Sequence, residues 1–400
     1  MVILLLLATA LQDWPQFRGP DGQGHASVRA LPLRWSDGEK IAWRTPVDGL
    51  GWSSPAVAGG RAWITTATDG GRSLRVQAFD VADGRRIVDV EIARLAAPDK
   101  IHPKNSHASP TAVVAGERVY VHFGSYATAC LGTDGKVLWR QELRYMPVHG
   151  PGGSPALVGD VLVVSCDGGD RQFVAGLDAA SGRVRWSTPR TGGTSQKKFA
   201  FSTPLVLDGP GRPQVVSPGA GVAGAYEAAT GRLVWQVRYG EGYSVIPRPV
   251  RGHGLIFLGT GYDRPTLLAI REGGSGDVTD THVAWRMDRS APHSASPLLV
   301  GDELYVVSDN GVATCLDAKT GAVCWQERVG GRFSASPFFA AGRIYLQDED
   351  GATTVLQPGR THRVLARNEI KGRTLATPAP LEGALLIRTD KELIKIAGTD

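Results

Sequence analysis

The sequence predicts an all-β protein, an eight-bladed β-propeller of four-stranded antiparallel blades whose last blade is completed by an N-terminal strand. Three observations support this: an excess of turn-forming residues, a repeat of 40 to 55 residues, and several short apolar runs inside each repeat. The chain has 51 Gly and 25 Pro among 400 residues, nearly one residue in five, against about 12% in average proteins. A chain that reverses direction this often is not a helical bundle.

A proline preceded by Ser, Thr or Ile marks each repeat. Most of these prolines open a short apolar run, followed by a Gly-containing turn and a second run rich in β-branched and aromatic residues, as in ELYVVSD and RIYLQDE. Such runs are typical of strands. The eight prolines are Pro55, Pro110, Pro155, Pro204, Pro247, Pro297, Pro337 and Pro378.

The second half of a repeat carries an acidic residue, a Gly and a Trp at fixed spacing. In the third repeat these are Asp178, Gly182 and Trp186. An Asp side chain accepts hydrogen bonds from backbone N–H groups ahead of it, and Gly adopts the left-handed conformation of a tight hairpin. Each repeat therefore predicts four strands and a Trp that packs against the next repeat. A period of this length with four strands is typical of a propeller blade.

The two ends of the chain are predicted to meet in one blade. The last repeat, from Thr377, has too few residues for four strands, and the segment 41–44 carries a Trp that belongs to no other repeat. We expect this N-terminal strand to complete the last blade and remove its free sheet edge. The propeller domain is expected to span residues 13–400.

Residues 1–12 are interpreted as a signal peptide. They begin with the apolar run MVILLLLATA, which ends in an Ala-x-Ala-like cleavage site. No Lys or Arg precedes the run, so a first strand or a tail is the alternative. The run is shorter than the about 20 apolar residues that span a bilayer. We therefore expect a periplasmic or secreted protein with no membrane span.

The net charge of +5 is spread along the chain, and no basic block is longer than Lys197-Lys198. A nucleic-acid partner is therefore not expected, and the protein is expected to be a monomer.

The Ser-Pro strand, the Leu-Asp-Ala turn and the closing Trp resemble the pyrroloquinoline-quinone (PQQ) repeat of quinoprotein dehydrogenases and their non-catalytic relatives. The resemblance covers residues 41–397, with the clearest copies at 154–186 and 296–325. The opening segment 13–20 is similar to that of secreted PQQ-like propellers of environmental bacteria. The outer-membrane assembly factor BamB uses the same architecture as a scaffold without a cofactor, so the fold alone does not decide the function.

The resemblance implies a PQQ and calcium site only where the ligands are present. Enzymes of the family typically carry a disulfide between adjacent cysteines and Glu, Asn and Asp ligands around Ca²⁺, an ion that prefers oxygen ligands. Here the four cysteines are isolated, no stretch aligns with that ligand set, and Cys-x-x-Cys-His is absent. We therefore expect no cofactor and no catalytic residues. The predicted function is a binding scaffold for a protein or a small ligand, and the alternative is a PQQ-dependent alcohol or sugar oxidoreductase.

Polar and aromatic residues gather just before several of the Ser/Thr-Pro steps. The strand that follows is the innermost of its blade, so these residues are expected to converge at one mouth of the central channel. Histidine is the commonest metal ligand, but no His-x-x-x-His or His–carboxylate spacing supports a metal. One interpretation is a pocket for an anion or a sugar, and the other is a polar channel lining. The candidate ligand-binding residues are His102, His107, His149, Lys198, Tyr243, His293 and Arg332.

Cys315 and Cys324 flank the predicted hairpin at 317–322 symmetrically. If they face each other across the two strands, a disulfide can form at a non-hydrogen-bonded pair; otherwise they are two small buried thiols. Two insertions, at 94–105 and 272–282, break the repeat and are the predicted partner contacts.

Overall fold

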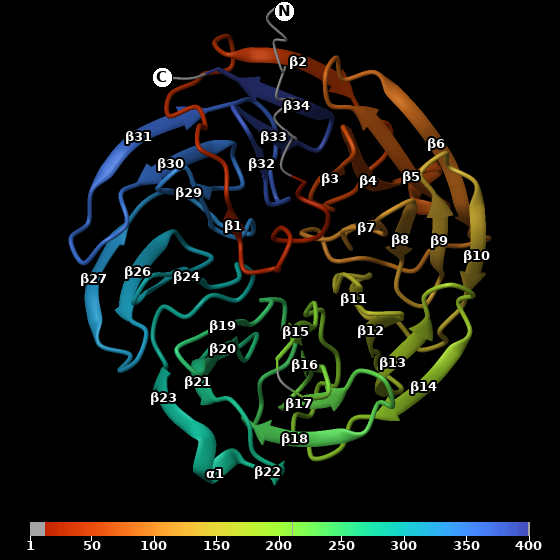
Figure 1. The fold of residues 1–400 in the computed structure, drawn as a ribbon, viewed down its shortest axis with the longest axis vertical. Coiled ribbons are helices and arrows are strands. Elements are labelled where there is room, and N and C mark those ends of the chain that lie inside the picture. Colours follow the sequence, from red (N-terminus) through yellow and green to blue (C-terminus); the bar gives the residue numbers. More distant parts are fainter. Residues whose placement is uncertain (1–12, 210, 399–400) are drawn as a thin grey trace, which may run out of the picture.

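The computed structural model describes residues 13–209 and 211–398, which form a ring of eight β-sheets around a central channel (Figure 1). Each sheet is a blade whose strands follow one another from the channel to the rim. The predicted signal peptide, residues 1–12, lies outside the described residues. Within the described part of the chain, no helix is long and apolar enough to cross a bilayer.

The first four blades follow the chain in order, from the innermost strand outward. Their strands are β3 (Ala56–Ala58), β4 (Arg61–Thr68), β5 (Ser73–Asp80) and β6 (Arg86–Arg94); β7 (Val113–Ala115), β8 (Arg118–His122), β9 (Thr128–Gly132) and β10 (Val137–Gln141); β11 (Ala156–Val158), β12 (Val161–Asp167), β13 (Gln172–Asp178) and β14 (Val184–Pro189); and β15 (Leu205–Leu207), β16 (Gln214–Pro218), β17 (Val222–Glu227) and β18 (Leu233–Arg238).

The other four blades complete the ring, and the last takes its outer strand from the N-terminal part of the chain. Their strands are β19 (Val250–Gly252), β20 (Leu255–Gly259), β21 (Leu267–Arg271) and β23 (Val283–Met287); β24 (Leu298–Val300), β25 (Glu303–Val307), β26 (Val312–Asp317) and β27 (Val323–Arg328); β28 (Phe338–Ala340), β29 (Arg343–Gln347), β30 (Ala352–Leu356) and β31 (Val364–Glu369); and β32 (Ala379–Leu381), β33 (Ala384–Arg388), β34 (Glu392–Ala397) and β2 (Ile41–Pro46).

The predicted closure of the ring is confirmed. Strand β2 pairs antiparallel with β34, with Arg44 opposite Ile394. Both termini of the propeller therefore share blade 8, and the edge of β34 is covered. The eight blades and the four strands in each blade are also as predicted.

The outer-strand tryptophans tie neighbouring blades together, as the sequence predicts. Each of five indole N–H groups donates a hydrogen bond of 2.9 to 3.1 Å to a carbonyl in the hairpin of the next blade. In four of these cases the indole also packs on the turn glycine of that hairpin. The donor and acceptor pairs are Trp43 and Val81, Trp139 and Ala179, Trp186 and Ala228, Trp285 and Ala318, and Trp325 and Gly359.

Replacing one turn glycine tests this contact. Gly182 has φ +73°, and an added Cβ would lie 2.5 Å from the Trp139 ring. Gly159 also has positive φ, +58°, but its Cβ would meet nothing within 4 Å. We expect Gly159→Ala to cost about 1–2 kcal/mol from backbone strain alone. Gly182→Ala should cost roughly 2–5 kcal/mol, because Trp139 must also move. Urea denaturation of both variants measures the difference, and equal costs would show that the Trp–Gly contact is not tight.

In blades 2 and 5 the innermost strand begins a few residues after the repeat proline, Pro110 or Pro247. The innermost strands of blades 2 and 5 begin at Val113 and Val250, whereas the other six prolines directly precede their strands. The recurring feature is the residue two positions before the innermost strand, such as Thr111, which in six of the eight blades bonds to its equivalent in the next blade. These backbone N–H to hydroxyl bonds are 2.9 to 3.0 Å long and run Ser54 to Thr111, Thr111 to Ser154, Ser154 to Thr203, Arg248 to Ser296, Ser296 to Ser336, and Ser336 to Thr377.

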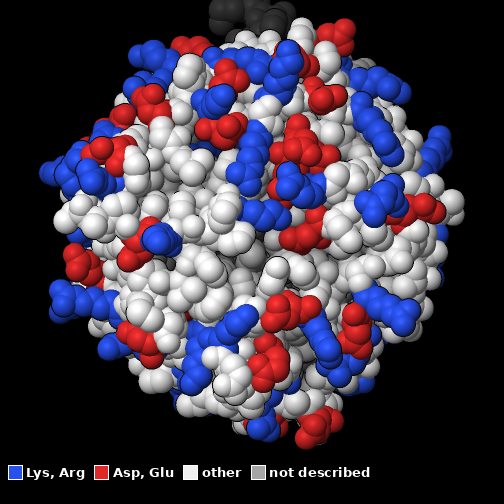
Figure 2. All heavy atoms as spheres, turned by 180° about the vertical axis from the view of Figure 1, so that it is seen from behind, with Lys and Arg blue, Asp and Glu red and all other residues white. Residues whose placement is uncertain are grey.

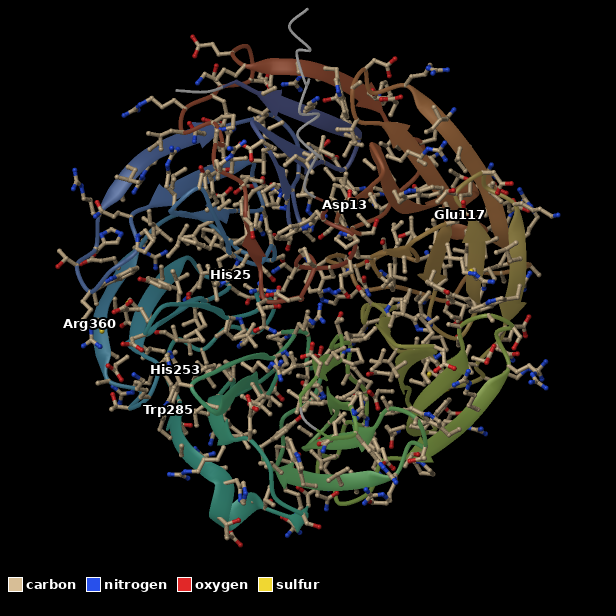
Figure 3. All side chains as sticks on the ribbon, in the orientation of Figure 1. Asp13, His25, Glu117, His253, Trp285 and Arg360 are labelled. Carbon is tan, nitrogen blue, oxygen red and sulfur yellow. The ribbon has the colours of Figure 1, made fainter. Side chains whose placement is uncertain are left out.

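Residues 13–32, here called the plug, lie across one end of the channel, on the face seen in Figures 1 and 3. Strand β1 (His25–Ala26) in the plug pairs parallel with β28, the innermost strand of blade 7. The buried Arg18 donates hydrogen bonds to Pro297 O at 2.6 Å and Pro337 O at 3.1 Å. These carbonyls belong to blades 6 and 7, so the plug is anchored inside the channel. The sequence did not predict this element.

The insertion at 272–282 covers blade 4. Its strand β22 (Gly276–Asp277) pairs parallel with the outer strand β18, and helix α1 (Thr279–His282) follows. Val278 between them is buried. This insertion therefore contacts its own propeller, and the prediction that it binds a partner stays untested.

Candidate functional site at the channel mouth

The channel contains a small cavity that opens at the end opposite the plug. Its volume is about 110 Å³, and Phe17 of the plug contributes to its lining. The walls carry hydroxyl groups of the innermost-strand positions, including Thr111, Thr203 and Thr377, together with a few apolar side chains such as Phe201. The cavity is therefore polar enough for water and small compared with the about 300–1,000 Å³ of typical small-molecule sites.

A segment between blades 1 and 2, residues 95–107, lies over this end of the channel and is called the strap. The backbone N–H of His102 and the side-chain amide of Asn105 both donate to His149 O, at 3.2 and 2.8 Å. On its other side, Arg373 Nη1 donates to Pro103 O at 3.3 Å. The strap thus connects the linker before blade 3 with the linker before blade 8.

Lys104 of the strap reaches two carboxylates on the far side of the mouth. Its Nζ lies 2.7 Å from Glu349 Oε1 and 3.6 Å from Asp309 Oδ2. Asp309 and Glu349, called the acidic pair, occupy equivalent positions, two residues after β25 in blade 6 and after β29 in blade 7. These ion pairs attach the strap to blades 6 and 7. The strap therefore links these blades to the linker before blade 3, across the mouth.

Hydroxyl groups at the rim of the cavity hold the acidic pair in place. Ser334 Oγ donates to Glu349 Oε1 at 2.7 Å, and Ser294 Oγ donates to Asp309 Oδ2 at 2.8 Å. The Glu349 side chain is only 1% exposed. Burial acts to raise the pKa of Glu349. The hydrogen bonds from Lys104 and Ser334 and the positive charge of Lys104 outweigh this effect, so the pKa is lowered. Glu349 is therefore a buried carboxylate held in its ionised form.

An arc of rings follows the rest of the mouth and is called the aromatic arc. Successive ring centroids are 5.5, 5.2, 5.4, 6.1 and 5.1 Å apart, and all five contacts are edge-on. The arc ends beside the acidic pair, because the backbone N–H of His293 donates to Asp309 Oδ1. Its members in order are His102, His149, Phe199, Tyr243, Tyr262 and His293.

Figure 2 shows this face of the molecule, opposite to that in Figure 1. A small hollow lies near the centre, with acidic and basic side chains gathered above and beside it and a broad uncharged area on the other side. The mouth is thus charged on one side and largely uncharged on the other.

Four of the predicted ligand-binding residues, His102, His149, Tyr243 and His293, come together in the aromatic arc. Burial, with a smaller effect of the charges of His102 and Lys197, lowers the pKa of His149. This histidine is therefore favoured in its neutral form. Whether these residues bind a ligand stays a prediction.

The other three predicted residues lie differently. Arg332 is exposed at the rim, with Nε 3.8 Å from Glu349 Oε2. His107, the last residue of the strap, is buried, and its Nε2 bonds to Asp99 O at 2.9 Å, so it is not part of the arc. Lys198 is exposed, and it is the preceding Lys197 that bonds to Tyr243 Oη at 2.7 Å.

The sequence prediction missed Lys104, Asp309 and Glu349. One signal was present: an acidic residue recurs two positions after the second strand in three successive blades, as Asp309, Glu349 and Asp390. Lys104 had no such signal, because it stands in an insertion outside the repeat. Its contacts with Asp309 and Glu349 are apparent only in the tertiary structure, where the closed ring brings these residues together.

Cys315 and Cys324 are not directly opposite each other. Trp325 faces Cys315 in the register of β26 and β27, and Cys324 is the extra residue of a β-bulge. Both are free thiols in the structure. Burial and the neighbouring Cys324 raise the pKa of Cys315 to about 12. A disulfide between them in an oxidising compartment stays a prediction.

The residues in the channel do not fit PQQ with calcium. The cavity is too small for a flat tricyclic quinone, and its lining offers hydroxyl groups but no carboxylate, whereas Ca²⁺ takes six to eight oxygen ligands, often carboxylates. Among the described residues, no group of three or more His, Cys, Asp or Glu side chains could hold a metal ion.

The fold and the repeat define a PQQ-type β-propeller. The sequence profile of the family described as "Outer membrane protein assembly factor BamB" matches residues 33–150, 130–274 and 219–365. The chain therefore belongs to this family. No curated protein sequence matches the chain significantly.

Solved structures of different function share the fold. BamB from Moraxella catarrhalis has a TM-score of 0.64 and 17% identity, over 89% of this chain and 96% of that chain. The quinohemoprotein alcohol dehydrogenase from Comamonas testosteroni has a TM-score of 0.67 and 11% identity, over 97% and 81%. The computationally designed protein Ika8 has a TM-score of 0.61 and 12% identity, over 91% and 99%. At these identities the likeness concerns the fold alone.

Proposed function

We propose that this protein is a periplasmic or secreted, non-catalytic scaffold that binds a partner protein on the face that carries the channel mouth. One observation carries the proposal: the plug lies across one end of the channel, and the cavity at the other end measures only about 110 Å³. Small-molecule sites are usually several times larger. Recognition is therefore assigned to the outer surface of the mouth and not to the interior.

The exposed residues of this face are of the kind that protein interfaces use. Met146 is 56% exposed, Tyr262 52% and Ile246 39%. Aromatic residues and Met are enriched at interfaces, because they bury large apolar areas. All three stand in loops around the mouth, in the linkers or hairpins of blades 2 to 5. An apolar surface beside a charged rim favours a protein partner.

Membership of the BamB family supports the same function. The matched family is described as an outer-membrane protein assembly factor. By this relation we propose that the partner is a protein of cell-envelope assembly and that residues 1–12 direct export.

Site-specific photocrosslinking in the producing cell tests the proposal. A photoreactive amino acid at Tyr262, on the mouth face, should give one discrete adduct. The matched control is Val364, which is 36% exposed at the start of β31, next to the hairpin on the opposite face, and it should give none. No adduct at Tyr262, or the same adducts from both positions, would contradict a partner site at the mouth.

A PQQ-dependent oxidoreductase is the second candidate, and the likeness to an alcohol dehydrogenase fold is the observation that favours it. Adding PQQ and Ca²⁺ to the purified protein should leave the melting temperature unchanged if the protein is a scaffold. A ligand at 100 times its Kd would add about 2.7 kcal/mol of stability. Such a shift, together with dye-linked alcohol oxidation, would replace the scaffold proposal with the enzyme.

A further inference from the structure

The ammonium group of Lys104 lies against two carboxylates that are more than 200 residues away in the sequence. Its ammonium group contacts both members of the acidic pair, Glu349 at 2.7 Å and Asp309 at 3.6 Å. The Lys104 side chain is 33% exposed, whereas that of Glu349 is 1% exposed. The anionic half of the contact is thus part of the propeller wall, and the cationic half comes from outside the repeat.

The acidic pair is not fully satisfied by Lys104. Glu349 Oε2 is buried and has no hydrogen-bond partner in the structure. Arg332 Nε lies 3.8 Å from this oxygen, which is beyond hydrogen-bond distance. A buried carboxylate oxygen without a donor is costly. An ammonium group has three N–H donors, so one that entered the site more deeply than Lys104 could donate a hydrogen bond to this oxygen.

The geometry suits a primary ammonium group. One nitrogen contacts both carboxylates, which matches a compact point charge and not the planar fork of a guanidinium. Two carboxylates are too few for a calcium site. The aromatic arc ends at His293, whose backbone N–H donates to Asp309 Oδ1, so the rings of the arc begin at a residue that contacts the pair.

Lys104 lies in the middle of the strap, which is held on both sides by hydrogen bonds. Besides those to His149 O and from Arg373 described above, Tyr126 Oη donates to Asp99 Oδ2 at 2.8 Å. The Lys104 side chain itself is 33% exposed. A competing cation therefore needs to displace only this side chain from its carboxylates, and the strap can stay in place.

We propose that Asp309 and Glu349 form a binding site for the primary ammonium group of an external ligand and that Lys104 occupies this site from within the chain. The ligand class is an alkylamine or the lysine side chain of a partner. The inference does not depend on the scaffold proposal, because a free amine would bind the isolated protein.

Chemical rescue tests the site. Lys104→Ala removes the internal cation and is expected to lower the melting temperature, and n-butylamine is expected to restore it in a concentration-dependent way. By calorimetry, n-butylamine should bind Lys104→Ala about tenfold or more tightly than wild type, because the Lys104 ammonium group no longer competes. n-Butanol and KCl at the same concentrations serve as controls for the alkyl chain and for ionic strength.

Three further variants make the result specific. Lys100→Ala removes an exposed lysine of the same strap and should gain no amine binding. Lys104→Ala/Glu349→Gln should lose the rescue, and Lys104→Ala/Asp309→Asn provides the same test at a more exposed position. Rescue by n-butanol, rescue that persists in both double variants, or the absence of rescue in Lys104→Ala would overturn the proposal.

Two ligands distinguish the sources of the ammonium group. The peptide acetyl-Gly-Lys-Gly-amide, compared with its norleucine counterpart, represents a lysine of a partner protein, and n-butylamine represents a small amine. Tighter binding of the lysine peptide to Lys104→Ala assigns the site to a protein side chain. Binding of n-butylamine alone assigns it to a small molecule. Neither result depends on the photocrosslinking at Tyr262.

Discussion

A chain that lacks residues 1–46 is expected to lose cooperative folding. The deletion removes β2, so blade 8 keeps three strands and β34 becomes a free edge. Leu393, Ile394 and Ile396 on β34 are fully buried in the native ring, and β2 is the strand that pairs with them. It also removes the Trp43 hydrogen bond that joins blade 8 to blade 1. An open ring with an unpaired apolar edge is prone to aggregate.

Far-UV circular dichroism, calorimetry and gel filtration measure this outcome. A circular permutant is the matched control, with residues 13–46 moved behind residue 398 through a flexible Gly/Ser linker. It keeps every residue of β2 and the plug, and it should melt cooperatively as a monomer. A monomeric truncated chain with a single sharp transition would show that closure by β2 is not required.

Arg190→Met is expected to destabilise the protein by about 3–5 kcal/mol at pH 7, because it leaves a buried carboxylate without its partner. Arg190 forms two hydrogen bonds with Asp167, of 2.6 and 2.8 Å, and donates to Ser217 O at 2.7 Å. The two charged side chains are 3% and 0% exposed. Since Asp167 lies on β12 and Ser217 on β16, the guanidinium joins blades 3 and 4.

The pH dependence gives the mechanism of this loss. Burial raises the pKa of Asp167, and removal of Arg190 raises it further. Because the folded-state pKa then exceeds the unfolded value of about 4, the cost is largest at neutral pH and decreases as the pH falls towards 4.

Urea denaturation of Arg190→Met at pH 7 and pH 5 checks both statements. The double variant Arg190→Met/Asp167→Asn should recover part of the loss, and Arg185→Met, which breaks a more exposed ion pair, should change stability little. A pH-independent loss in Arg190→Met, or no recovery in the double variant, would contradict the charge-burial explanation.

The repeat made most of the propeller predictable. The acidic residue, Gly and Trp of one hairpin interact locally or with the next repeat, so their spacing carries the information. Gly182 and Trp139 show this: the contact joins two hairpins that the same short pattern marks in each repeat. Proline alone does not mark where a strand begins: after Pro110 and Pro247 the innermost strands start at Val113 and Val250. In both blades the residue two positions before the strand makes the recurring contact between blades.

The candidate site was predictable only in part. His149, Tyr243 and His293 precede innermost strands at similar spacing, so their convergence followed from the repeat, whereas His102 stands in the insertion at 94–105. His107 stands in the same kind of segment but turns inward to Asp99 O, a local choice that no periodic pattern records. The bulge at Cys324 is a similar case, since one extra residue puts Trp325 opposite Cys315.

The sequence by itself determined the number of blades, the four strands in each blade, the tryptophan ties between blades and the closure of the ring by β2. All of these depend on residues that recur at fixed spacing, and each contact lies within a repeat or between neighbours. Only the tertiary structure decided that the plug lies across one end of the channel, that the strap lies at the other end, and that Lys104 meets Asp309 and Glu349. Those contacts join non-repeating segments to blades on the far side of the ring. They arise because a closed ring brings all eight innermost strands to one axis, which no local pattern can specify.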